Sequence, residues 1–216
     1  MIFNLSANNT IANHFVSELR DLEIQKDKAR FRKNLEKIGE ILAYEISKTF
    51  QYERKAISTP LAVTSVFHLA SQPVLATILR AGLPMYQGFS NFFDHAESAF
   101  IGAFRGEHQL DYTFDITLEY VAAPHLEDKN LILIDPMLAT GKSILSSYAS
   151  LLKYGKPSQL HVAAAIAAPE GIDLLQREIP GVSIWVGAID EKLNSQFYIV
   201  PGLGDAGDLA FGPKVG

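Results

Sequence analysis

The sequence predicts an α/β fold in which helices flank a doubly wound, mostly parallel β-sheet. Short apolar runs, of the kind buried on both faces of such a sheet, recur along the chain. Apolar positions at helical spacing follow several of them, and strands that alternate with helices indicate βαβ units. The expected strands lie at 73–79, 98–104, 131–134, 159–168 and 182–188, and the expected helices at 83–93, 143–152 and 170–178.

Length and composition favour a single domain, residues 1–216, that acts on a small molecule. With 216 residues, 48% of them hydrophobic, the chain can form one sizeable core. The absence of cysteine excludes disulfides, thiolate metal sites and a cysteine nucleophile. A net charge of -5 with mixed signs argues against a nucleic-acid partner. Since no apolar run approaches the ~20 residues of a membrane span and residues 1–9 lack signal-peptide features, we expect no membrane partner and a cytoplasmic location.

The chain before the first buried strand shows helix and hairpin patterns but no chemistry. Residues 1–21 are polar and weakly patterned. Residues 26–50 carry apolar side chains at helical spacing on one face and charges on the other, which predicts a long surface helix with a solvated charged face. Partial alternation around Pro60 predicts an edge strand or a projecting hairpin over residues 59–70.

Two arginines stand at the ends of expected strands. Arg80 follows the strand at 73–79, and Arg105 follows the strand at 98–104. An arginine at the end of a central strand is costly to bury unless an anion meets it, so the pattern indicates an anionic ligand, with an internal Arg–carboxylate pair as the alternative. The polar stretch after Arg105, residues 106–112, has no strong period and suits a lid over an anionic substrate.

The stretch LILIDPMLATGKS, residues 131–143, gives the clearest indication of a binding site in the sequence. A buried strand ends at Asp135, and small residues lead into the next helix. Backbone N–H groups and the positive end of the helix dipole then meet at one point, which predicts a phosphate site. The GKS segment also matches the end of a nucleoside-triphosphate P-loop, but Pro136 stands where that loop has its first glycine. The P-loop is therefore a weaker alternative, and a purely structural turn remains a second alternative at this point.

The C-terminal stretch YIVPGLGDAGD, residues 198–208, combines small residues and two aspartates around a proline. This composition argues against a regular helix or strand and predicts an ordered loop with exposed backbone groups. On composition alone, a C-terminal tail without function would be favoured. Three histidines, His95, His108 and His125, are dispersed without metal-ligand spacing, and we expect them on the surface.

Three motifs, ILRAGL, DPMLATG and YIVPGLGDAGD, resemble the uracil phosphoribosyltransferases and occur in that family's order. The resemblance runs from about residue 31 to the C-terminus. It implies a type I phosphoribosyltransferase-like fold with a projecting β-arm and a small C-terminal base-binding hood, in a homodimer or a larger homo-oligomer. It also implies transfer of the 5-phosphoribosyl group from 5-phosphoribosyl-1-diphosphate (PRPP) to uracil, giving UMP and diphosphate. Mg²⁺ is implied as a cofactor bound mainly through the diphosphate, without a ligand set in the protein.

The resemblance further implies roles for particular residues. The implied catalytic residues are Arg80, Arg105, Asp135 and Asp205. Uracil would be held by Ile199, Gly204, Asp205 and Ala206. PRPP would be held by Arg80, Arg105, Asp135, Pro136, Met137, Leu138, Ala139, Thr140, Gly141, Lys142, Ser143 and Asp205.

Two segments depart from the family pattern. Lys142 replaces the second glycine of the usual Gly-Gly-Ser, and we expect its ammonium to add a cation beside the 5'-phosphate of PRPP. After Arg105 the chain reads Gly106-Glu107-His108, where the family usually has an Arg-x-Glu-Glu-Thr-like sequence. A non-catalytic regulator of the same fold that senses UMP or PRPP is the alternative function, and a basic face would be expected of it if it bound RNA.

Overall fold

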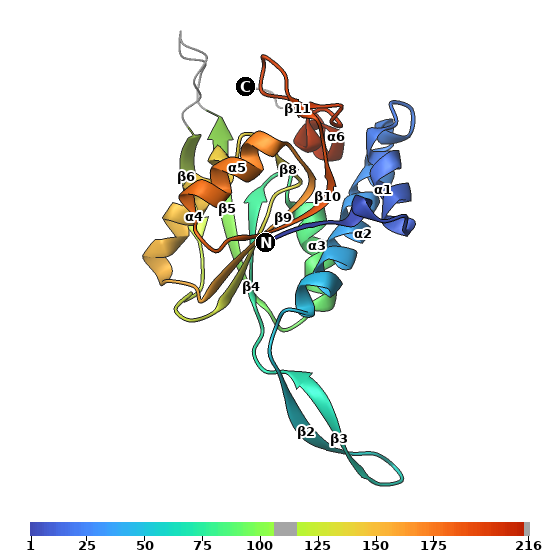
Figure 1. Cartoon of the computed structure of the whole chain (residues 1–216), viewed down its shortest axis with the longest axis vertical. Helices are drawn as coiled ribbons and strands as arrows, with labels where there is room; N and C mark the ends of the chain where they lie inside the picture. The colour runs from blue at the N-terminus through green and yellow to red at the C-terminus, as the bar shows by residue number, and fades with distance from the viewer. Residues whose placement is uncertain (106–115, 214–216) are drawn as a thin grey trace.

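A computed structural model gives the structure of the chain and describes residues 1–105 and 116–213, with side chains described for residues 1–102 and 120–213. An eight-stranded sheet lies at its centre (Figure 1). Across this sheet the strands follow the order β1 (Ile2–Asn4), β10 (Ser183–Ile189), β9 (Gln159–Ala167), β7 (Asn130–Ile134), β4 (Val74–Leu79), β5 (Glu97–Arg105) and β6 (Ile116–Ala122), and β8 (Met137–Leu138) also pairs with β9.

The sheet is parallel except for the β5–β6 pair, which is antiparallel. The five strands expected from apolar runs correspond to β4, β5, β7, β9 and β10, so the predicted mostly parallel sheet is confirmed. The sequence did not reveal β1, β6 and β8. Two of these are too short to show a period, since β1 has three residues and β8 has two.

Helices cover both faces of the sheet, as Figure 1 shows. Along β7, Ile132 and Ile134 pack in the core beneath α1, α2 and α3, whereas Leu131 and Leu133 pack beneath α4 and α5. Strand side chains alternate between faces, so a continuous apolar run is what a sheet covered on both sides requires. The helices are α1 (Ile11–Arg20), α2 (Lys28–Ser47), α3 (Leu83–Phe92), α4 (Lys142–Leu151), α5 (Pro169–Glu178) and α6 (Ala206–Phe211), with 3₁₀ turns at Leu5–Ala7, Ile24–Lys26 and Leu152–Tyr154.

The predicted hairpin is present and projects away from the sheet (Figure 1). It pairs β2 (Tyr52–Ser58) with β3 (Val63–Leu69) in antiparallel register. The sequence indicated only its second half. Nearly all side chains of β2 are exposed, so this strand has no buried face that would impose an alternation of apolar and polar residues on its sequence.

The expectation that residues 198–208 contain no regular structure is wrong. Ile199 and Val200 form β12, which pairs with β11 (Lys192–Leu193), and α6 begins at Ala206. The side chain of Asp205 caps α6 by accepting a hydrogen bond from the Asp208 backbone N–H at 3.0 Å. A cap and a partner strand therefore gave order to a stretch whose composition alone favours a loop.

Candidate active site

The two arginines and Asp135 stand at the ends of neighbouring strands. β4 pairs with β5 on one side and with β7 on the other. Arg80 directly follows β4, Arg105 is the last residue of β5, and Asp135 directly follows β7. The side chain of Arg105 lies outside the described residues, so only the position of its backbone is established. In parallel α/β sheets, ligands bind beyond such carboxyl ends.

Arg80 points a partly exposed guanidinium toward the C-terminal helix. Its Nη2 donates to the Gly212 carbonyl oxygen at 3.2 Å and lies 3.6 Å from Asp208 Oδ1. The structure thus contains the Arg–carboxylate pair that was the alternative to an anion site. Because the Arg80 side chain keeps 45% of its surface exposed, it can still meet an anionic ligand.

The turn that carries Arg80 is held tightly against the sheet. The Leu79–Arg80 peptide bond is cis. A Cβ placed on Gly82 would lie 2.3 Å from Thr77 Oγ1 and 2.8 Å from the Ile78 carbonyl oxygen. Glycine is therefore required here by the close approach of the turn to the end of β4.

The predicted phosphate loop connects β7 to α4. Asp135 donates its backbone N–H to the Ala163 carbonyl oxygen at 3.1 Å, and its Oδ1 accepts from the Met137 N–H at 3.2 Å. Gly141 caps α4 with a left-handed φ of 79°, a conformation that glycine adopts without strain. Helix α4 begins at Lys142, whose side chain is exposed, so the loop ends at the amino terminus of a ten-residue helix as expected.

Helix α5 shapes this loop from the other side. A Cβ on Gly171 would lie 2.3 Å from the Ala139 carbonyl oxygen, and a Cβ on Gly141 would lie 3.0 Å from the Gly171 carbonyl oxygen. The two glycines therefore allow the loop and the start of α5 to touch backbone to backbone.

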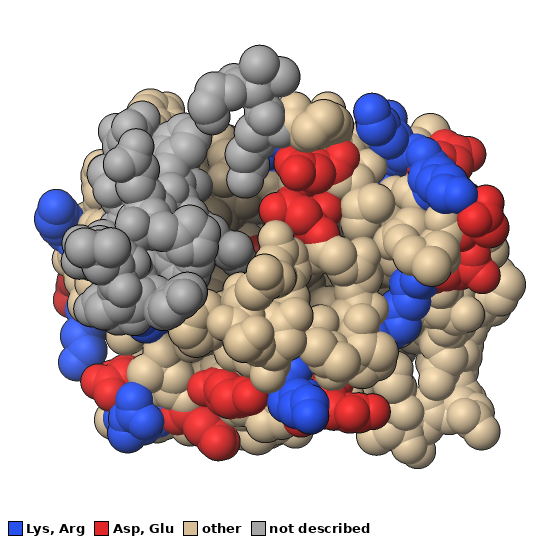
Figure 2. All heavy atoms as spheres, turned by 90° about the horizontal axis from the view of Figure 1, so that it is seen from above, with Lys and Arg blue, Asp and Glu red and all other residues tan. Residues whose placement is uncertain are grey.

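Figure 2 looks onto this end of the molecule, where acidic and basic side chains of the described residues are interspersed.

The C-terminal loop lies beside the Arg80 turn. A Cβ on Gly207 would be 3.8 Å from the Cβ of Ala81, and Asp208 is the carboxylate that faces Arg80. Ile199 and Ala206 are buried, whereas Gly204 is exposed with a φ of 97°. The segment directly after the implied uracil-binding residues therefore packs against the Arg80 turn.

Sequence reasoning missed an ion pair that holds this loop. Arg20 and Asp190 bind each other, and both bind the backbone of Gly202. No local pattern marks them, because the two side chains come from positions 170 residues apart.

Among the described residues, no group of three or more His, Asp or Glu side chains is placed to hold a metal ion. In the same part of the chain, no helix is long and apolar enough to cross a membrane.

The fold and the strand-end site define the class. A solved hypoxanthine phosphoribosyltransferase from Staphylococcus aureus shares the fold at a TM-score of 0.50, with 16% identity, over 75% of this chain and 76% of its own. A hypoxanthine-guanine phosphoribosyltransferase from Bacillus anthracis shares it at a TM-score of 0.51, with 14% identity, over 76% of this chain and 80% of its own. A structure titled "Structure of AQ2163 protein from Aquifex aeolicus" matches more fully, with a TM-score of 0.87, 32% identity and complete coverage of both chains. The protein therefore has the type I phosphoribosyltransferase fold.

The particular family follows from sequence. The uracil phosphoribosyltransferase family model matches residues 6–213. A uracil phosphoribosyltransferase of Porphyromonas gingivalis is 46% identical over 99% of both chains, and one of Pyrococcus furiosus is 38% identical over 93% of this chain and 85% of its own length. The chain belongs to the uracil phosphoribosyltransferase family.

Proposed function

We propose that this protein transfers the 5-phosphoribosyl group of PRPP to N1 of uracil and releases UMP and diphosphate. The proposal rests on the packing of the Arg80 turn, in a chain of the uracil phosphoribosyltransferase family. This turn lies against the end of β7, where the 135–141 loop begins, and against Gly207 and Asp208, which directly follow the 199–206 segment. An anion site, a phosphate loop and a base loop are the three parts that this reaction needs.

PRPP would lie along the ends of β4, β5 and β7. The amides at the start of α4, from Ala139 to Ser143, would receive the 5'-phosphate, supported by the positive end of the helix dipole. Asp135 would accept hydrogen bonds from the ribose hydroxyls. Arg80 and Arg105 would bind the diphosphate, whose charge grows as it leaves.

Uracil would lie against the C-terminal loop. Its two carbonyl oxygens and the N–H between them need donors and an acceptor in a fixed arrangement. Backbone groups at Ile199, Gly204 and Ala206 can supply them, and Asp205 would lie next to the ribose. Cytosine presents a different pattern and would leave buried polar groups unpaired, so such a loop would reject it.

The chemistry requires charge stabilisation rather than a protein nucleophile. The bond between C1' and the diphosphate oxygen breaks, the bond between C1' and N1 of uracil forms, and the N1 proton is released. Because C1' becomes cationic in an oxocarbenium-like transition state, the site must bind the departing diphosphate and exclude water. Hydrogen bonds to the uracil carbonyls would make the N1 proton easier to release.

The oxygen atoms at the site suit a Mg²⁺ ion that is bound mainly through the diphosphate of PRPP. Asp208 offers a carboxylate close to Arg80, and its buried Oδ1 makes no hydrogen bond. The Asp205 carboxylate adjoins it and accepts a hydrogen bond from the Asp208 backbone N–H. Oxygen ligands are those that Mg²⁺ prefers, and two carboxylates leave most of its six positions to diphosphate and water. When bound, the ion would neutralise charge on the leaving diphosphate.

We also propose that the protein is a homodimer or a larger homo-oligomer in which the β2–β3 hairpin is a contact. The hairpin leaves Leu61, Val63 and Phe67 exposed, at 96%, 73% and 64% of their surface. Exposed apolar side chains on a projecting element are typical of a subunit interface.

One assay tests the central proposal. Purified protein is incubated with labelled uracil and PRPP, and UMP is measured, with cytosine, hypoxanthine and orotate as competitors. We expect UMP to form and the competitors to have little effect. Binding of UMP or PRPP without turnover would instead support the regulatory alternative.

A further inference from the structure

The C-terminal loop is fastened by the Arg20–Asp190 ion pair. Arg20 is the last residue of α1, and Asp190 directly follows β10. Arg20 Nη1 donates to Asp190 Oδ2 at 2.8 Å, and Nη2 donates to Oδ1 at 2.5 Å, which makes the pair bidentate. The side chain of Asp190 is only 3% exposed, so its charge depends on this partner rather than on water.

Both polar backbone groups of Gly202 are bound by this pair. The Gly202 N–H donates to Asp190 Oδ2 at 2.9 Å, and its carbonyl oxygen accepts from Arg20 Nη1 at 3.0 Å. Gly202 has a φ of 65°, and a Cβ there would lie 2.1 Å from the Ile199 carbonyl oxygen. Position 202 therefore requires glycine. The ion pair fixes both the position and the orientation of the loop at this point.

Backbone hydrogen bonds tie the pair to the central sheet. The Asp190 N–H donates to the Ala167 carbonyl oxygen at the end of β9, at 2.8 Å. The next N–H, that of Glu191, donates to the Val200 carbonyl oxygen at 3.0 Å. The loop is thus tied to the central sheet through Asp190 and to α1 through Arg20.

We propose that Arg20 and Asp190 are positioning residues for uracil, which set the backbone of residues 201–205 at the distance and angle that base recognition needs. The inference rests on the proposed function, because Gly202 lies between Ile199 and Gly204, two residues proposed to bind the base. Recognition by backbone groups is sensitive to placement, and a shift of about 1 Å can cost on the order of 100-fold in rate. Only Asp205 of this segment is also proposed to meet PRPP. The other residues proposed to bind PRPP lie at the ends of β4, β5 and β7 and at the start of α4, so loss of the pair should affect uracil much more than PRPP.

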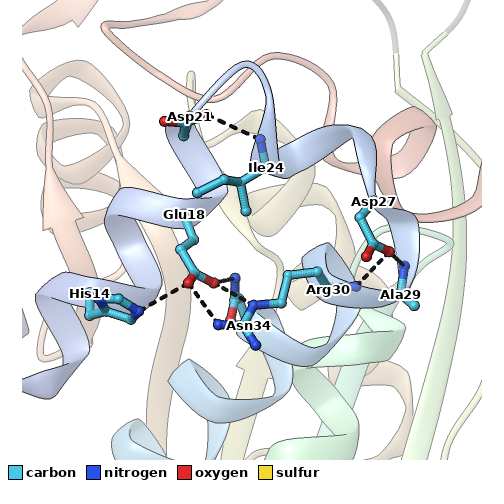
Figure 3. A network of polar contacts seen from close by, with 8 residues as sticks. All are labelled: His14, Glu18, Asp21, Ile24, Asp27, Ala29, Arg30 and Asn34. Carbon is cyan, nitrogen blue, oxygen red and sulfur yellow. Dashed lines mark hydrogen bonds and ion pairs between the residues drawn. The ribbon is translucent and has the colours of Figure 1, made fainter.

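The Glu18–Arg30 pair provides a matched control (Figure 3). Glu18 also lies on α1, and Arg30 binds it through two hydrogen bonds of 2.6 and 2.7 Å, with a third from Asn34 at 2.7 Å. These hydrogen bonds, first that of Arg30, hold the pKa of Glu18 down to about 2. The partners of Glu18 lie on α1 and α2, so this pair fastens two helices rather than the C-terminal loop.

The experiment compares Asp190→Asn with Glu18→Gln, which remove the same charge from the two pairs. Uracil and PRPP are varied separately. In Asp190→Asn we expect the KM for uracil to rise about tenfold or more while the KM for PRPP stays within about twofold. In Glu18→Gln we expect both KM values to stay within about twofold and only the melting temperature to fall.

A double variant tests the pair itself. Arg20→Gln combined with Asp190→Asn removes the guanidinium that the single variant leaves without its carboxylate, and we expect it to recover part of the affinity for uracil. If Asp190→Asn cannot be recovered folded, Arg20→Lys replaces it, since lysine keeps the charge but cannot form the bidentate pair. The same rise in the KM for uracil is expected.

Two results would overturn the inference: an unchanged KM for uracil in Asp190→Asn, or equal increases for both substrates. Amide hydrogen exchange at residues 202–205 gives a readout that does not depend on turnover, and we expect faster exchange in Asp190→Asn than in the wild type or Glu18→Gln. A wild-type protein that forms no UMP would refute the proposed function alone. The fastening of the loop would then be judged by exchange, where faster exchange in Asp190→Asn supports it and equal exchange in all three proteins overturns it.

Discussion

His161 should make the protein progressively less stable as the pH falls below its ordinary titration range. Its ring is buried in β9, its Nδ1 accepts a hydrogen bond from Trp185 Nε1 at 3.1 Å, and the Phe50 ring meets it edge-on at a centroid distance of 5.4 Å. Its Nε2 is buried and has no hydrogen-bond partner. Burial lowers the pKa of His161 from 6.5 to about 4, because the apolar surroundings disfavour the charged ring.

The size of the effect follows from the gap between these two pKa values. The unfolded chain binds the proton near the ordinary value of 6.5 and the folded chain only near 4, so between them the unfolded state holds more protons. Stability is unaffected well above pH 6.5 and falls as the pH drops through this window. At 1.36 kcal/mol per pKa unit, the loss is about 2 kcal/mol at about pH 5 and approaches about 3 kcal/mol below about pH 4.

Urea unfolding of the wild type and His161→Asn between pH 8 and pH 5 measures this loss. The asparagine oxygen can replace Nδ1 as the acceptor for Trp185, but the side chain does not titrate. We expect the difference in unfolding free energy between the two proteins to change by about 2 kcal/mol across this range, in favour of the variant at low pH. Since Glu18 and the other carboxylates are present in both proteins, their contributions cancel. Parallel stability curves for the two proteins would refute the reasoning.

Four further predictions concern the site and the assembly. Excess chelator should stop UMP formation, and an unchanged rate would show that Mg²⁺ has no role. Arg105→Ala should raise the KM for PRPP by about 10-fold to 100-fold, because a charge-assisted hydrogen bond is lost, and should leave uracil binding to the PRPP-loaded protein nearly intact. Equal losses of affinity for both substrates would contradict the assignment. Lys142→Gly should keep activity but weaken UMP binding by up to ~1.5–3 kcal/mol, measured by calorimetry at low and high salt. Tighter binding by the glycine variant would mean that Lys142 obstructs the loop. Light scattering at micromolar concentration should give a dimer or larger, and a monomer would exclude the hairpin as a subunit contact.

The sequence by itself determined those features that short, continuous patterns encode. The run at 131–134 predicted a strand buried on both faces, and β7 indeed lies between two helical layers. The helix over 26–50 and the turn from Asp135 into α4 could likewise be predicted from sequence. Helical periodicity marks the first, and small residues before a helix start mark the second, and both signals lie within a few neighbouring positions. The family motifs then gave candidate roles to residues whose chemistry the local pattern could only outline.

The tertiary structure alone decided what depends on distant partners. Strand β1 has three residues, and its pairing with β10 comes from the far end of the chain. The order at 199–200 and 206–211 likewise needed β11 and the cap of Asp205. Arg20 and Asp190 look like ordinary charged residues until the fold brings them to Gly202, because a salt bridge between positions 170 residues apart has no local signal. Local sequence sets which helices, strands and turns can form, whereas hydrogen bonds and ion pairs between remote segments decide how the C-terminal loop is held.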